Sequence, residues 1–148
     1  MTVKQTSLSS LLLLAGCIGH GQVRGEPLYP IDTSGPLPLD RVASLSGAIE
    51  SVDGQPVQTG HRFELLPGCH TVKNASRWGG AGWVNAMNGR MPVRSFAMNM
   101  RAGYYYYIRI EEGARSGSGG APLLVAEEQA PNGKPSRQFD SGQPCDAN

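Results

Sequence analysis

The sequence predicts an all-β protein: a small antiparallel β-sandwich, or a partly open barrel, that follows an N-terminal signal segment and a flexible tether. Short apolar or alternating stretches recur between Gly, Pro and Asp residues, which is typical of strands joined by turns. Tyrosine and isoleucine, which favour strands, are concentrated in residues 104–110. No stretch has the length, caps and periodicity of a long amphipathic helix. These observations favour packed layers of strands.

Residues 1–16 have the features of a secretory signal peptide. Lys4 supplies a positive charge, residues 8–14 form a short apolar run, and Ala15 and Gly16 are the small residues expected before a cleavage site. A transmembrane helix would need about 20 apolar residues, so the run is too short to cross a membrane. We expect this segment to be removed.

The signal segment ends in Leu14-Ala15-Gly16-Cys17, which resembles the lipobox of bacterial lipoproteins. The resemblance implies cleavage before Cys17 and a lipid on its thiol, and two or more acyl chains anchor a protein firmly. Because Ile18 and not Asp follows the cysteine, it also implies the outer membrane of a bacterial envelope, with the protein facing the periplasm or the cell surface. The alternative is an ordinary secretory signal with Cys17 as a bystander.

The remaining chain divides at residue 40. Residues 17–40 are rich in Gly and Pro and have few periodic apolar positions, which predicts a lipidated tether. Residues 41–148 are predicted to form a β-sandwich domain, because a chain of 148 residues supports one modest core.

The first predicted strands flank two turns. Residues 44–52 stop at Asp53-Gly54, a strong turn signal. The apolar spacing of this stretch also fits a helix, but the turn and Gly47 favour a strand. Residues 62–66 and 69–73 lie on either side of Pro67-Gly68 and are predicted to form a hairpin.

Three later strands complete the predicted sandwich. Residues 93–100 alternate, with Phe96, Met98 and Met100 on the core side. After a turn comes the most strand-like stretch, 104–110, whose even-numbered residues share one face while its odd-numbered residues, including two tyrosines, share the other. The last predicted strand covers residues 122–127.

Three cysteines are an odd number for an exported protein. Lipidation of Cys17 would leave Cys69 and Cys145 as a pair in a compartment where disulfides persist. We therefore expect a disulfide between them, which would fasten the polar C-terminal tail. The alternatives are two unpaired thiols or a metal site, but two cysteines without a nearby histidine pair make a poor zinc set. No metal or other cofactor is expected.

The charge balance argues against nucleic acid as a partner. Without Lys4, the 13 Lys and Arg residues become 12, against 12 Asp and Glu residues. No basic patch or acidic run stands out, whereas nucleic-acid binding relies on clustered positive charge.

A second resemblance covers about 30 residues. Residues 47–54 and 63–72, with a strand that ends in Val52-Asp53-Gly54 and a later turn at Pro67-Gly68 before His70, are similar to small extracytoplasmic β-domains, including PEGA-like modules. The tyrosine-rich strand after Gly103 looks like that of uncharacterised bacterial lipoproteins. The resemblance implies an envelope β-sandwich that serves as a surface or interaction module, and it implies no catalytic residues.

Two ligand-binding alternatives remain open. Trp78 and Trp83, in a glycine-rich loop, are candidate contacts for a glycan or a partner protein, because indole rings stack on sugars and anchor interfaces. Alternatively, the rings cap the core. The second alternative is copper, since thioether and imidazole suit this metal; Met98 and Met100, however, have the pattern of core residues. The set is Met87, Met91, Met98 and Met100 with His61 and His70.

No catalytic constellation emerges from the sequence. Three scattered histidines form no recognised motif, and the acidic pairs Glu111-Glu112 and Glu127-Glu128 are neighbours that diverge on a strand. We therefore expect no enzyme. The predicted function is that of a lipid-anchored envelope protein whose β-sandwich is an interaction or structural module, with the membrane and an envelope protein or glycan as partners.

Overall fold

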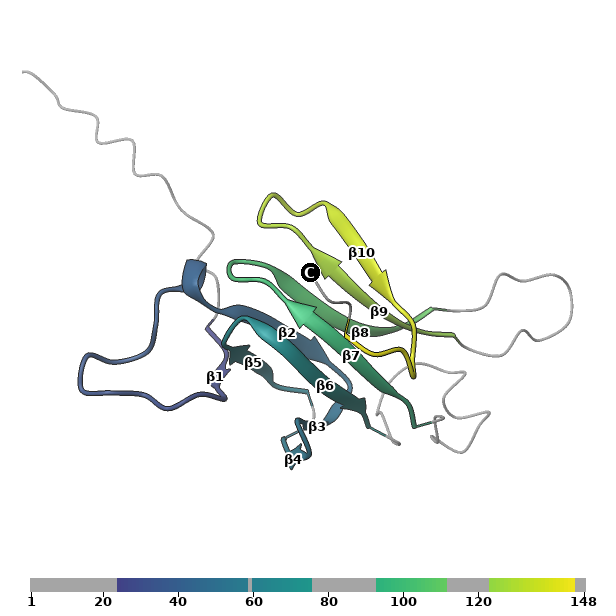
Figure 1. The fold of residues 1–148 in the computed structure, drawn as a ribbon, viewed down its shortest axis with the longest axis horizontal. Coiled ribbons are helices and arrows are strands. Elements are labelled where there is room, and N and C mark those ends of the chain that lie inside the picture. The colour runs from purple at the N-terminus through teal and green to yellow at the C-terminus, as the bar shows by residue number, and fades with distance from the viewer. Residues whose placement is uncertain (1–23, 59, 76–92, 112–122, 146–148) are drawn as a thin grey trace, which may run out of the picture.

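The computed structural model describes residues 24–58, 60–75, 93–111 and 123–145, which form two packed β-sheets (Figure 1). The large sheet has the strand order β1-β5-β2-β8-β9-β10, and the small sheet has the order β4-β3-β6-β7. The strands are β1 (Glu26–Pro27), β2 (Ala43–Gly47), β3 (Ile49–Val52), β4 (Gln55–Pro56), β5 (Arg62–Leu65), β6 (Gly68–Asn74), β7 (Ser95–Met100), β8 (Tyr105–Glu111), β9 (Leu123–Gln129) and β10 (Pro135–Phe139), with a short 3-10 helix η1 (Leu39–Arg41) before β2.

The predicted fold class is confirmed: the described chain is a mostly antiparallel β-sandwich, and its sheets do not close into a barrel. The exceptions to antiparallel pairing are β1 with β5 and β2 with β8, which run parallel. Between β2 and β8 the chain enters the small sheet twice, as β3 and β4 and then as β6 and β7, with β5 of the large sheet between the two visits.

The core lies between the sheets and uses the faces that alternation predicts. Phe96, Met98 and Met100 of β7 are buried, as are Tyr106 and Ile108 of β8. The odd-numbered tyrosines of β8 lie on the other face and are half-buried. The core side predicted for residues 93–100 is therefore confirmed, and in β8 the even-numbered face is the buried one.

The stretch predicted as one strand, 44–52, is two strands in different sheets. The chain changes sheet at Gly47, whose φ is 123°, a value that side chains disfavour. A Cβ at Gly47 would also lie 2.2 Å from the carbonyl oxygen of Ile108. Beyond this point, β3 ends in the predicted turn, where Asp53 and Gly54 both have positive φ, as a type I′ hairpin to β4 requires.

The predicted hairpin of residues 62–66 with 69–73 is wrong. The two strands exist, but β5 pairs with β1 and β2 in the large sheet, whereas β6 pairs with β3 and β7 in the small sheet. The Pro67-Gly68 turn therefore carries the chain from one sheet to the other. The residues of the turn determine that the chain reverses at this point. The partner of each flanking strand depends instead on the burial of its apolar face.

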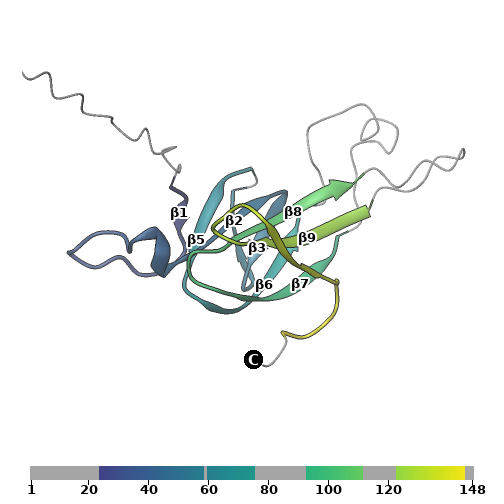
Figure 2. The same cartoon turned by 90° about the horizontal axis from the view of Figure 1, so that it is seen from above.

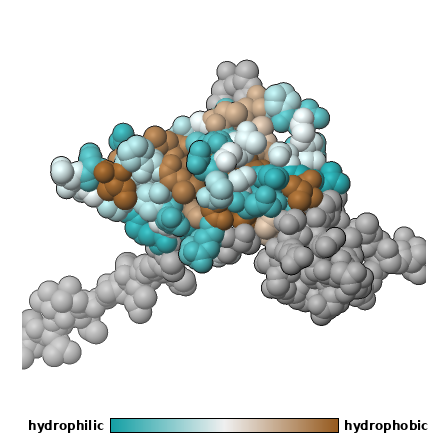
Figure 3. Space-filling view, turned by 90° about the horizontal axis from the view of Figure 1, so that it is seen from below, coloured by the Kyte–Doolittle hydropathy of each residue, from teal (hydrophilic) through white to brown (hydrophobic). Residues whose placement is uncertain are grey.

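Part of the predicted tether, 17–40, is attached to the domain, and the tether as a whole stays a prediction. Residues 24–38 form a segment that we call the strap: its first part is attached to the large sheet, where β1 pairs with β5 and Tyr29 is buried, and the loop that follows projects away from the sandwich (Figures 1 and 2). Hydrophobic side chains are visible at the end of the molecule that the strap forms (left in Figure 3). Gly and Pro content predicts irregular backbone, but it does not exclude attachment by a few specific side chains.

The C-terminal region contains more structure than expected. The last predicted strand, 122–127, is β9, and the tail after it forms a further strand, β10, that pairs with β9. None of the described helices is long and apolar enough to cross a membrane.

Candidate functional site

The strap is attached to the large sheet through Glu64, whose side chain is fully buried (0% exposed). Arg24 donates from Nε to Oε1 at 3.0 Å and from Nη2 to Oε2 at 2.6 Å. The backbone N–H of Gly25 donates to Oε1 at 3.0 Å, and the Tyr29 hydroxyl lies 3.4 Å from Oε2. We call these four residues the Glu64 cluster.

The partners of Glu64 keep its carboxylate charged. Hydrogen bonds from Arg24 lower the pKa of Glu64; burial opposes this, and the Gly25 N–H and the charge of Arg24 support it. The same contact raises the pKa of Arg24. A buried carboxylate with an arginine and two more donors is satisfied, and it would be strongly destabilising without them.

A similar arrangement surrounds Glu128 on β9, toward the opposite edge of the large sheet. The side chain of Glu128 is also 0% exposed. Arg101 donates from Nε to Oε2 at 3.2 Å and from Nη2 to Oε1. The Tyr106 hydroxyl donates to Oε2 at 2.6 Å, and the Ser136 hydroxyl donates to Oε1 at 2.8 Å. We call these four residues the Glu128 cluster.

The Glu128 cluster, unlike the Glu64 cluster, is built from the sandwich itself: from β8, β9, β10 and the turn that precedes β8. Burial raises the pKa of Glu128, but hydrogen bonds from Arg101, Tyr106 and Ser136 outweigh it, so the pKa is lowered overall. Burial, reinforced by the hydrogen bond to Glu128, raises the pKa of the Tyr106 hydroxyl strongly. Tyr106 therefore stays neutral and donates its proton to the carboxylate.

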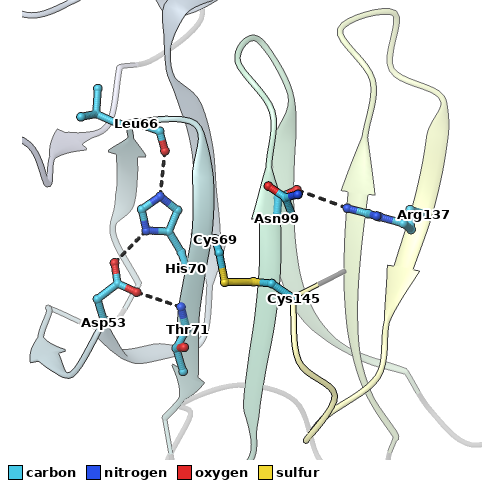
Figure 4. Close-up of a disulfide and its surroundings, with 8 residues drawn as sticks. All are labelled: Asp53, Leu66, Cys69, His70, Thr71, Asn99, Arg137 and Cys145. Carbon is cyan, nitrogen blue, oxygen red and sulfur yellow. Dashed lines mark hydrogen bonds and ion pairs between the residues drawn. A yellow bond between two sulfur atoms is a disulfide. The ribbon is translucent and has the colours of Figure 1, made fainter. Parts of the chain in front are cut away.

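A pocket of about 190 Å³ lies beside the Glu128 cluster and is lined by Arg101, Glu128, Ser136 and Arg137. Its charged groups are engaged with the protein: Arg101 binds Glu128 and Ser136, and Nη2 of Arg137 donates to the carbonyl oxygen of Asn99 at 3.2 Å. The second contact joins β10 to β7, across the two sheets (Figure 4). These groups therefore hold the sheets together.

The structure pairs Cys69 with Cys145 in a disulfide, in agreement with the expected pairing; the Cα atoms are 5.9 Å apart. Cys69 lies on β6, so the bridge fastens the C-terminal tail to the small sheet (Figure 4). The tail also donates the N–H of Gly142 to the carbonyl oxygen of Ser95, at the start of β7.

His70 lies beside this bridge and joins two turns. Its Nδ1 is 2.7 Å from Oδ2 of Asp53, and its Nε2 is 2.7 Å from the carbonyl oxygen of Leu66 (Figure 4). The ring therefore links the turn after β3 to the turn before β6. Asp53 also accepts the N–H of Thr71 at 2.8 Å, which fixes the β3–β4 turn against β6.

Several predicted site residues lie outside the described residues. These are the predicted lipidation site Cys17 and the two predicted ligand contacts, Trp78 and Trp83. Their roles stay predictions, and so do the contributions of Met87 and Met91 to a copper site.

The described part of the copper set is dispersed. Met98 and Met100 are buried in the core, as their pattern predicts. His70 faces Met98 across the β6–β7 pair, but both of its ring nitrogens contact Asp53 and Leu66. His61 is exposed and lies 3.8 Å from Glu26. Within residues 24–58, 60–75, 93–111 and 123–145, no three His, Cys, Asp or Glu side chains are grouped as for a metal ion.

The acidic pair on β9 diverges, as strand alternation predicts. Glu128 belongs to its cluster, whereas Glu127 accepts a hydrogen bond from Arg109 at 2.9 Å on the opposite face. The two carboxylates therefore serve separate structural contacts.

The tyrosines on the outer face of β8 cover the sheet: the Tyr107 hydroxyl donates to Gln129 at 3.0 Å.

Sequence reasoning missed both carboxylate clusters. A signal was present in each case: Glu64 interrupts the apolar run from Phe63 to Leu66, and Glu128 follows the apolar strand that starts at Leu124. A charge at such a position needs a partner. The partner could not be chosen, because Arg24 and Glu64 are 40 residues apart.

Comparison of the chain with protein-family models, with curated proteins and with solved structures finds no match.

Proposed function

We propose that the protein is a lipid-anchored component of the bacterial cell envelope, attached to the outer membrane through Cys17, and that its β-sandwich is a non-enzymatic interaction or structural module. The disulfide is the observation that carries this proposal. Of the three cysteines, it takes up Cys69 and Cys145 and leaves Cys17, the one in the lipobox-like stretch. A disulfide also fits an exported protein, because the cytosol keeps thiols reduced.

The use of the charged groups supports a module that acts by contact. Glu64 and Glu128 are each bound by an arginine and a tyrosine of the same chain, and Glu127 is bound by Arg109. Their carboxylates stabilise the fold. The glycan alternative rests on Trp78 and Trp83, outside the described residues, and the described members of the copper set are dispersed, so neither alternative receives specific support.

The proposal is tested by labelling and fractionation of the full chain in a bacterial host. An alkyne fatty acid added to the culture should label the wild type, which should remain with the outer-membrane fraction. The Cys17→Ser variant should lose the label and leave the membrane.

The matched control is the double variant Cys69→Ser with Cys145→Ser. It should keep the label, because positions 69 and 145 are far from the signal segment in the sequence. Labelled Cys17→Ser protein, or wild type without label, would contradict the proposal. The unfolding free energy of Cys17→Ser should match that of the wild type, since residue 17 precedes the strap.

A further inference from the structure

The strap presents apolar side chains that folding does not bury. Leu28, Ile31 and Leu37 are exposed, and Ile31 is the most exposed of them at 53%. They fall within ten residues of the chain, in the loop at the end of the molecule (left in Figure 3). Single exposed apolar residues are ordinary, but several in one short loop indicate a contact surface. We call these three residues the apolar tip.

The loop that carries the apolar tip is held in a fixed shape by polar contacts on its inner side. The Tyr29 hydroxyl accepts the N–H of Leu37 at 3.1 Å, and Arg24 donates from Nη2 to the carbonyl oxygen of Leu37. Asp32 accepts the N–H of Ser34 at 2.8 Å, which closes the turn. The loop is therefore ordered from within, and its exposed apolar side chains are not needed to order it.

The covalent chain limits how far the apolar tip can be from residue 17. Seven residue steps separate Cys17 from Arg24 (24 minus 17). An extended chain spans at most about 3.6 Å per residue, so the two residues cannot be more than about 25 Å apart. Arg24 is fixed to Glu64 and to Leu37. If Cys17 carries the lipid, the strap is therefore the described part of the domain with the shortest connection to the bilayer.

We propose that the apolar tip rests on the surface of the bilayer that holds the lipid of Cys17, with Ile31 in the interfacial layer. This inference rests on the proposed lipid anchor. The contact sets the orientation of the sandwich on the membrane, with the strap toward the lipid and the start of β7 away from it. Partial burial of a few apolar side chains binds a bilayer only weakly. The lipid anchor, however, keeps these side chains close to the bilayer, so the contact forms as readily as a contact within one molecule.

The charges of the strap favour a neutral lipid surface over an anionic one. Glu26 and Asp32 are exposed acidic groups, and hydrogen bonds from Ser34 lower the pKa of Asp32, so it remains negative. The charge of Arg24 is balanced by Glu64. The contact is therefore apolar in origin, and zwitterionic phosphatidylcholine vesicles are a suitable probe.

The test uses the full lipidated chain with an environment-sensitive fluorophore on the introduced thiol of an Ile31→Cys variant. The native cysteines are occupied by the proposed lipid and by the disulfide. The matched control is Val93→Cys, an exposed apolar residue that precedes β7 at the far end of the sandwich. After reconstitution into phosphatidylcholine vesicles, the label at position 31 should shift to the blue and be quenched by nitroxide lipids, and the label at position 93 should do neither.

Vesicle flotation separates failure of this inference from failure of the anchor. Protein that floats with the vesicles without a shift at position 31 keeps the anchor and overturns the membrane contact. A shift that grows with protein density and is insensitive to nitroxide lipids overturns it in favour of a second copy of the chain. Protein that does not float overturns the anchor and, with it, this inference.

Discussion

Glu64 and Glu128 have the same kinds of partners, an arginine and a tyrosine, but they occupy different places in the fold. Glu64 points away from the core, because its strand neighbours Phe63 and Leu65 point into it; its partners Arg24, Gly25 and Tyr29 all belong to the strap. Glu128 lies on the same side of β9 as the core residues Leu124 and Ala126. One chemistry therefore attaches an added segment in the first case and closes the end of the core in the second.

This difference decides how each cluster responds to damage. If the Glu64 cluster loses a partner, the strap can detach and water can reach the carboxylate, while the sheets stay paired. If the Glu128 cluster loses Arg101, water can reach the carboxylate from the neighbouring pocket, but Tyr106 of β8 and Ser136 of β10 still bind it within the large sheet. Detachment of a peripheral segment is therefore available to the first cluster only.

The disulfide is a third attachment, and a covalent one. We expect its removal to cause the largest loss of stability, against which the two carboxylate clusters can be compared. The disulfide closes a loop with a sequence separation of 76 residues. Replacing both cysteines, Cys69→Ala with Cys145→Ala, should lower the free energy of unfolding by about 3–4 kcal/mol, mainly because the unfolded chain gains freedom. Urea unfolding measures this. An unchanged midpoint would show that the disulfide contributes nothing to stability.

A loss of about 2–3 kcal/mol is expected for Arg101→Met, because it leaves Glu128 buried without its cation. The value lies below the usual range for buried pairs, because the arginine side chain is itself 47% exposed. Urea unfolding should show one cooperative transition at lower urea. If Arg101→Met loses no more stability than the strap variant Arg24→Met, the two clusters do not differ in the proposed way.

The matched strap variant, Arg24→Met, should have a smaller effect on global unfolding. Its main effect should be local: the strap detaches, and a protease should cut residues 24–38 faster than in the wild type while the sandwich stays intact. Limited proteolysis with mass spectrometry measures this. Equal cleavage in both proteins would show that Arg24 does not hold the strap.

Acid should release the strap as well. The pKa of Glu64 is lowered in the folded state, chiefly by Arg24, so its contribution is complete above the ordinary range of Glu, about pH 4.3, and is lost as the pH falls below it. The NMR signal of the Leu28 amide should therefore move toward its unfolded position only at pH values below the ordinary range of Glu. A Glu64→Gln variant should lack this titration; if it titrates like the wild type, another group is responsible.

Local sequence patterns predicted strands and their buried faces, but not their partners. Alternation placed Phe96, Met98 and Met100 correctly, because period-two burial is a property of each strand alone. The change of sheet at Gly47 and the destination of the chain after Pro67 depend on contacts between distant segments, for which a single sequence carries no local signal.

The candidate site follows the same rule. The disulfide could be inferred because cysteine chemistry allows few partners, and the expected pairing agrees with the structure. The composition of the strap predicts a tether and gives no sign of its attachment, because that attachment depends on Arg24 and Tyr29, which contact Glu64 only in the folded large sheet.

Native-state hydrogen exchange tests most directly whether the strap is a separately attached segment. The N–H of Leu28 donates to the carbonyl oxygen of Glu64 at 2.8 Å, and that of Ser44 donates to Tyr104 at 2.9 Å. At low urea, Leu28 should exchange through an opening that costs less free energy than global unfolding, whereas Ser44 should exchange only with global unfolding. Equal opening free energies with equal urea dependence at both amides would contradict the account.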